Sequence, residues 1–209
     1  MINFKNLKNM KKIILTMALV MAFSFANAQS NDKGKIHVNV MFGIINGNAS
    51  ITNDYGVIFP TFDPNANEID YSAAGVNFGA NFQYGFTKNI SAGAGIEINT
   101  VELTTNNVGD ISLTLFKVNF SGRYYFLNQE KINVYAGPSI GYTSGIQSSG
   151  PNSFEDTYSG LNFGINSGCN YYFGEKVGMI FNLGYEVNSL GNTSIDGVKA
   201  MLGLALKFR

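Results

Sequence analysis

Side chains that commonly carry out catalysis are scarce in this chain. It has one histidine, His37, and one cysteine, Cys169. A hydrolase or acyltransferase needs a nucleophile with a general base beside it, and the residue two positions from His37 on the same face is Asn39 rather than a serine. We therefore expect no enzyme. His37 is predicted to be a hydrogen-bonding residue, and Cys169, which has no partner for a disulfide within the chain, a small apolar side chain.

Acidic and amide side chains recur between Asp63 and Asp70, a pattern that metal sites also use. Asp63, Asn65, Asn67, Glu68 and Asp70 offer the oxygen ligands that calcium prefers. A calcium-binding loop, however, requires glycine at its sixth position, and that position holds Glu68. We expect an acidic loop without a metal. The glycine-rich segments are not followed by a helix N-terminus that could bind phosphate, so the sequence predicts no cofactor.

Five charged residues lie on the otherwise neutral polar faces of alternating segments. They are Glu97, Lys117, Arg123, Glu186 and Lys199. If the segments pair as antiparallel hairpins, we predict Glu97 opposite Lys117 and Glu186 opposite Lys199, the second from a register that sets Val177 opposite Phe208. In one interpretation these pairs, with Tyr125, Tyr135 and Tyr172, fill and stiffen a narrow interior. In the other they line an ion path or a gate. The small width expected of the interior favours the first interpretation.

The segments that carry these residues alternate apolar and polar positions, which is typical of β-strands with two unlike faces. We predict eight strands, over residues 34–45, 74–86, 90–103, 111–126, 132–142, 158–173, 177–188 and 196–208. No charged residue falls on an apolar face, where a Lys or Arg at mid-bilayer would cost about 2–4 kcal/mol. The polar face is small and neutral, unlike the charge-rich surface of a soluble barrel. The sequence therefore predicts an all-β, eight-stranded antiparallel transmembrane β-barrel, with a bulge near Thr100 and Val101, where the alternation changes phase.

The N-terminus has the features of an export signal. Four lysines precede an apolar run over 13–25 and a small-x-small sequence that ends at Ala28. We predict a cleaved signal peptide over residues 1–28 and one outer-membrane barrel domain over 29–209. The mature chain would retain ten basic residues against fourteen acidic ones. Because there is no basic excess, nucleic acid is not an expected partner.

Short and long connections alternate between the predicted strands. The short ones lie at 87–89, 127–131 and 174–176, and the longer ones at 46–73, 104–110, 143–157 and 189–195. Outer-membrane barrels have short periplasmic turns and longer external loops. Aromatic residues and lysines gather beside the short turns, whereas the long loops hold acids and neither lysine nor arginine. We therefore predict that both termini are periplasmic and that four loops lie outside the cell.

The first long connection contains aromatic residues among its acids. These are Tyr55, Phe59, Phe62 and Tyr71. Exposed apolar side chains are typical of a contact surface for a partner, for lipid headgroups or for a host molecule. Packing of the same side chains onto the barrel rim is the other interpretation. We predict a surface contact at these four residues, with a ligand that the sequence does not identify.

Three segments carry a resemblance to a known family: Asn133 to Tyr142, Gly160 to Gly168 and Val198 to Phe208. They resemble the small outer-membrane β-barrel domain of the OmpA, OmpX and OmpW type, especially the "porin family" barrels common in Bacteroidota. The resemblance covers essentially the whole mature chain. It implies a monomer in contact with outer-membrane lipid and lipopolysaccharide. It also implies insertion by the barrel-assembly machinery, which reads an aromatic residue at the end of the last strand; here Phe208 is penultimate.

Three functional hypotheses follow from these observations. The leading one is a barrel with a filled interior that has a structural role, an adhesion-type role through its external loops, or both. The first alternative is transport of small or hydrophobic molecules, which would enter the barrel mouth and leave sideways into the membrane. The second is an accessory role in a secretion apparatus, which the breadth of the family suggests.

Overall fold

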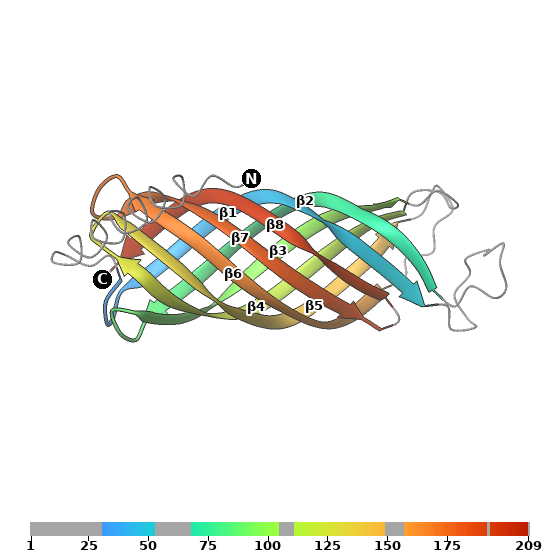
Figure 1. The fold of residues 1–209 in the computed structure, drawn as a ribbon, viewed down its shortest axis with the longest axis horizontal. Coiled ribbons are helices and arrows are strands. Elements are labelled where there is room, and N and C mark those ends of the chain that lie inside the picture. Colours follow the sequence, from blue (N-terminus) through green and yellow to red (C-terminus); the bar gives the residue numbers. More distant parts are fainter. Residues whose placement is uncertain (1–30, 53–67, 105–110, 149–156, 192, 209) are drawn as a thin grey trace, which may run out of the picture.

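Eight antiparallel strands form a closed barrel in the computed structural model, which describes residues 31–52, 68–104, 111–148, 157–191 and 193–208. The strands are β1 (Ile36–Thr52), β2 (Glu68–Gly85), β3 (Ile90–Thr104), β4 (Ile111–Asn128), β5 (Ile132–Ser148), β6 (Thr157–Tyr172), β7 (Val177–Leu190) and β8 (Thr193–Phe208). Each strand pairs with its neighbours in sequence, and β8 pairs with β1 to close the sheet (Figure 1). The predicted eight-stranded antiparallel barrel is confirmed. Within the described ranges, no helix has the length and apolar character needed to cross a membrane.

The two ends of the barrel differ in their connections. At one end, which we call the turn end, β1 begins, β8 ends and short turns join β2 to β3, β4 to β5 and β6 to β7 (Figure 1). The opposite end, the loop end, carries the connections from β1 to β2, β3 to β4, β5 to β6 and β7 to β8. The predicted signal peptide over 1–28 lies outside the described residues.

Three strands extend by six or seven residues further toward the loop end than the sequence predicted. β1 continues to Thr52 rather than ending at residue 45, and β5 continues to Ser148 rather than 142. β2 begins at Glu68 rather than 74, so that Asp70 and Tyr71 lie in a strand and not in a loop. The extra residues pair regularly, from Asn46 opposite Ala74 to Thr52 opposite Glu68 in the first hairpin. In this hairpin the prediction was wrong because apolar residues of the extensions, such as Ala49 and Tyr71, lie on the inward face. In β5 Ile146 still points outward, and the inward residue Thr143 is polar.

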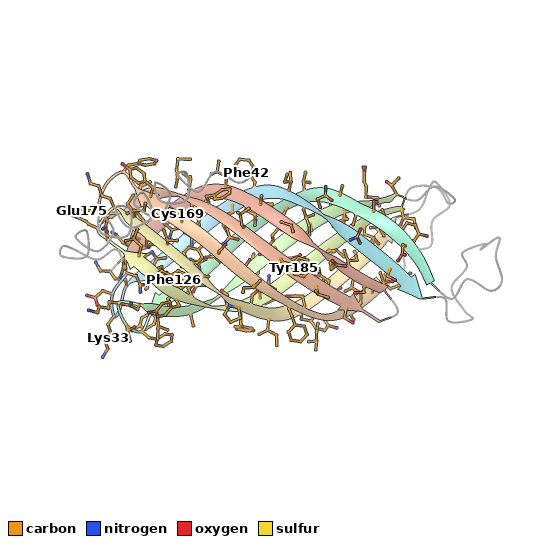
Figure 2. The ribbon with its side chains drawn as sticks, viewed as in Figure 1. Lys33, Phe42, Phe126, Cys169, Glu175 and Tyr185 are labelled. Atoms are coloured by element: carbon orange, nitrogen blue, oxygen red, sulfur yellow. The ribbon has the colours of Figure 1, made fainter. Side chains whose placement is uncertain are left out.

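From the turn end to about the middle of the barrel, apolar side chains point outward. Phe42, Phe120 and Ile165 are each more than 60% exposed, and Figure 2 shows Phe42 and Phe126 at the outer surface of the barrel. The inward positions of the same strands hold amides, hydroxyls, glycines and charged side chains. Such a surface would expose a large apolar area to water, so it suits contact with lipid.

Nearer the loop end the two faces of the sheet exchange residue types, so that polar side chains point outward and apolar ones inward. In β3, Ile98 points outward and Asn99 inward; beyond them Thr100 and Glu102 are exposed, and Leu103 is buried. The pairing of β3 with both neighbours is unbroken through this region. The predicted bulge near Thr100 and Val101 is therefore wrong. The strand keeps its phase, and only the kind of residue on each face changes.

The inward residues of the loop end form an apolar core. Its buried members are Ile45, Ala49, Tyr71, Ala73, Val101, Leu103, Ile111, Leu113, Leu115, Leu190 and Ile195. β1 runs through this region from Ile45 to Thr52. At about 3.3 Å per residue and a strand tilt of about 40°, the region is roughly 20 Å tall. The loop end thus has the construction of a small water-soluble barrel, joined without a break to a part whose outside is apolar.

The ladder between β4 and β5 is irregular near the turn end. Its register shifts between Tyr125 and Leu127, and no pair is formed between those of Ser121 with Ser139 and Tyr124 with Ala136. Pro138 lies in this gap and has no N–H to donate to a neighbouring strand.

Replacement of Leu103 by alanine tests the exchange of faces. Leu103 is fully buried inside the loop end, so Leu103→Ala should lower the free energy of unfolding by about 2–5 kcal/mol, whereas Thr104→Ala, on the exposed face next to it, should change it by less than about 0.5 kcal/mol. The measurement is urea unfolding of the refolded barrel in detergent micelles, followed by circular dichroism. Equal losses in the two variants would contradict an apolar interior at this level.

Candidate functional site: the barrel interior

Aromatic and polar rings fill the interior near the turn end. His37 is completely buried, and its Nδ1 lies 2.7 Å from the hydroxyl of Tyr172. Tyr125 packs edge-to-face on Tyr135, with 5.8 Å between ring centroids. A side chain at Gly168 would collide with the Tyr135 ring, so glycine is what leaves room for that ring. This layer blocks the interior with four large side chains from β1, β4, β5 and β6.

The short segment before β1 ties two turn-end elements together. The Asn31 amide Nδ2 donates to the carbonyl oxygen of Thr87, at 2.9 Å, and its backbone N–H donates to Asn128 Oδ1, at 2.8 Å. Asn128 Nδ2 in turn donates to the Asn31 carbonyl oxygen, at 2.7 Å. Asn31 therefore links the turn after β2 to the end of β4. Asn31 was not among the predicted site residues, because an asparagine outside any alternating segment gives no sequence signal of such a contact.

A buried network of four charges crosses the middle of the interior. Glu186 binds two lysines: Lys117 in a close ion pair and Lys199 with 3.0 Å between Nζ and Oε2. Lys199 also contacts Glu97, with 2.9 Å between Nζ and Oε2. Lys117, Glu186 and Lys199 are all at most 5% exposed in their side chains. The network joins β3, β4, β7 and β8, so it connects strands that are not neighbours in the sheet.

The predicted cross-strand pairs are realised only in part. Glu97 does lie opposite Lys117 in the register, as predicted, but each of these side chains binds a partner across the barrel instead. The register predicted for the last hairpin is wrong by two residues, because Val177 pairs with Leu206 and Glu186 with Gly197. Lys199 still reaches Glu186 along the diagonal between the two strands, a distance that long side chains can span.

Arg123 lies between the charge network and the aromatic layer. Its guanidinium carbon lies 4.2 Å from the centre of the Tyr135 ring, and Nη2 donates to Asn81 Oδ1, at 3.2 Å. A cavity of about 40 Å³ adjoins it, lined by residues that include Glu97, Asn119 and Ser139. This volume holds at most a few water molecules. At this level of the barrel the described side chains therefore leave little open space.

Of the four residues predicted to form a surface contact, the structure describes only Tyr71. Tyr71 is only 3% exposed and belongs to the apolar core of the loop end, so its assignment to an external loop is wrong. It points inward because β2 begins at Glu68, which places Tyr71 on the inward face of a strand. Tyr55, Phe59 and Phe62 lie outside the described residues.

The described interior residues that could take part in catalysis are few. Among the described residues, His37 packs against tyrosine rings, its Nδ1 is hydrogen-bonded to Tyr172, and its Nε2 has no hydrogen-bond partner. Cys169 is half-buried, lies in β6 and is not in a disulfide (Figure 2). In the ranges that the structure covers, no three His, Cys, Asp or Glu side chains come together in a way that could hold a metal ion. The arrangement can block the barrel interior and join strands that are not neighbours in the sheet.

Comparison with known proteins identifies the fold. The sequence model of the outer membrane protein beta-barrel domain matches residues 15–208. OprG from Pseudomonas aeruginosa superposes with a TM-score of 0.65 at 15% identity, over 88% of this chain and 100% of that chain. Ail, the attachment invasion locus protein of Yersinia pestis, gives a TM-score of 0.47 at 15% identity, over 84% and 99%. Neisserial surface protein A gives 0.48 at 12% identity, over 84% and 100%. No curated protein matches the sequence.

Removal of the Glu186 charge should be more harmful than removal of the Glu97 charge. Glu186→Gln leaves Lys117 buried without a carboxylate and should cost about 3–5 kcal/mol of stability, whereas in Glu97→Gln both lysines keep Glu186. Urea unfolding in micelles measures both losses.

A double variant supplies the control for this prediction. Lys117→Met added to Glu186→Gln should recover part of the loss, because it removes the charge left unpaired. Strictly additive losses in the double variant would refute the pairing of Lys117 with Glu186.

Proposed function

The chain belongs to the outer membrane β-barrel domain family, and from this premise we propose that it is a monomeric barrel with a sealed interior that acts at the cell surface through its loop end. The observation that carries the proposal is the exchange of faces near the loop end. There the outside is polar and the inside is an apolar core. Part of the barrel thereby extends out of the lipid, and the loops sit on a rigid support roughly 20 Å tall.

The loop end is the external end in this proposal, and both termini are periplasmic. Three of the four loop-end connections, over 53–67, 105–110 and 149–156, are longer than the turns of three or four residues at the opposite end and support this orientation. The longer connection predicted over 189–195 is wrong, because only residues 191 and 192 lie between β7 and β8. The exposed charges support it as well. The described outward side chains of the loop end include Asp70, Glu102 and Asp196, and no lysine or arginine lies there among the described residues. Lys33 and Lys88 lie exposed at the turn end.

A structural and adhesive role agrees with the filled interior. Three layers follow one another from the turn end: the rings around His37, the charge network of Glu186 and the apolar core around Leu103. An interior packed in this way has no path for bulk solutes. The surfaces left for interaction are the outside of the loop end and the four connections that it carries.

Aromatic residues of the first loop are the proposed contact residues. Tyr55, Phe59 and Phe62 stand beside Asp54 and Asp63 in the sequence between β1 and β2. An aromatic contact that is rimmed by acids suits an apolar surface or a partner with basic groups around an apolar centre.

Sideways transport of a small hydrophobic molecule is the second candidate, and one observation favours it. The interior cavity and a groove on the outer face share Ser121, Gly122 and Ser139, so the wall is thin where the ladder between β4 and β5 is interrupted. A hydrophobic solute arriving from the loop end would first have to cross the charges of Lys117 and Glu186, which makes this route costly. An accessory role in secretion would use the same loop-end surface and is separated from adhesion by its binding partner.

Three substitutions in the first loop test the surface role. Cells that display the Tyr55→Ser, Phe59→Ser, Phe62→Ser variant should lose most of the barrel-dependent retention on an apolar bead surface and most of their barrel-dependent aggregation. Both are measured by sedimentation against cells without the protein. The matched control is Asp54→Asn with Asp63→Asn, which changes charge and leaves the aromatic residues in place.

Two further readouts make the result of this test decisive. In a Cys169→Ala background, Thr104→Cys should react with a membrane-impermeant maleimide on intact cells, since Thr104 is exposed at the loop end. The amounts of folded wild-type and variant barrel should be equal. If the aromatic variant is folded and displayed but adheres as the wild type does, the surface role through this loop is refuted.

A further inference from the structure

Arg123 is a buried cation without a carboxylate partner among the described residues. Its side chain is 7% exposed, and its contacts are the Asn81 amide oxygen and the Tyr135 ring. The charge network already uses both interior carboxylates, since Glu97 and Glu186 bind Lys117 and Lys199. In the middle of the interior, three cations therefore face two carboxylates. The surplus positive charge is located at Arg123.

An unpaired charge in a barrel surrounded by lipid is costly. Moving an ion out of water carries a penalty of several kcal/mol unless a counter-charge or hydrogen bonds replace its hydration. The Nη1 group of Arg123 is buried and has no hydrogen-bond partner within the described chain. A guanidinium stays charged at all physiological pH values, so loss of a proton cannot remove the cost. The described residues therefore leave this cation without the negative charge that would balance it.

The cavity beside Arg123 collects hydrogen-bond donors. Ser121 Oγ accepts a hydrogen bond from Gln83 Nε2, at 2.7 Å, and Ser139 Oγ accepts one from Asn166 Nδ2, at 3.0 Å. Each hydroxyl has therefore used acceptor capacity and retains its own proton to donate. Both serines line the cavity together with Arg123. Two hydroxyl donors and a free N–H of a cation thus border one small space.

Two other residues of the cavity wall affect what it can bind. Asn119 Oδ1 is buried without a partner, and rotation of this amide would present Nδ2 as a further donor. Glu97 also lines the cavity, but both of its carboxylate oxygens accept from Lys199 Nζ, at 3.0 and 2.9 Å. Its charge is therefore balanced by a lysine in direct contact.

We propose that this cavity is a binding site for a small monovalent inorganic anion, such as chloride, held by Arg123, Ser121 and Ser139. The volume of about 40 Å³ is sufficient for a halide. One negative charge balances the one surplus cation, so a divalent anion would overcompensate. The anion completes the interior packing and does not depend on the surface role proposed for the loops.

Thermal unfolding at constant ionic strength tests the proposal. The refolded mature chain in detergent micelles is melted while sodium chloride replaces sodium gluconate, whose anion is too large for the cavity. Above the dissociation constant, Tm should rise by about 3–6 °C for each tenfold increase in chloride. Arg123→Gln should abolish this dependence. Lys207→Gln, which removes a cation that does not line the cavity, should retain it.

A second variant and a direct observation keep the test decisive if Arg123→Gln does not fold. Ser121→Ala with Ser139→Ala removes two donors and should raise the chloride concentration at which Tm begins to rise by about tenfold or more. Crystals grown in bromide should show an anomalous peak inside the cavity. The proposal is overturned if chloride and gluconate give equal Tm values, if Tm of the serine variant begins to rise at the same chloride concentration as the wild type, or if bromide is absent from the cavity.

Discussion

A chain that crosses a lipid bilayer with strands must pair every backbone N–H and C=O within itself, because hydrocarbon offers no hydrogen-bond partner. This constraint closes the sheet of eight strands into a barrel, with β8 paired to β1 along its length. Eight strands leave an interior only wide enough for side chains. The same closure that satisfies the backbone therefore creates a confined space, in which every polar group needs a partner and every large group needs room.

The kind of side chain that fills the interior changes along the barrel axis. Where the outer surface is apolar, the interior contains long charged side chains that meet across the barrel, and Glu186 forms ion pairs with both Lys117 and Lys199. Nearer the loop end the outer surface is polar, so the interior reverts to the apolar packing of a water-soluble protein. The break in the ladder at Pro138 lies beside the cavity of Arg123, which is lined by the neighbouring residues Gly137 and Ser139.

The sequence predicted the strands, their number and the inward position of Glu97, Lys117, Arg123, Glu186 and Lys199, because alternation reports faces directly. It failed where a rule about membranes was applied to residues outside the apolar band: the extensions of β1 and β2 keep alternating, but with Ala49, Tyr71 and Ala73 inside. It also paired charges with residues directly opposite. Lysine side chains are long enough to cross a narrow barrel. Which charges meet therefore depends on the three-dimensional shape of the interior, and the register between adjacent strands does not determine it.

The claim of a sealed interior is tested most directly by single-channel conductance of the refolded mature chain in a planar bilayer, with folding verified on the same sample by circular dichroism and by gel mobility with and without heating. Ring, charge and apolar layers in series predict a folded barrel that gives no steady conductance at moderate voltage. Discrete, reproducible openings by a folded barrel would contradict the account. They would make the charges around Glu186 part of an ion path rather than part of a plug.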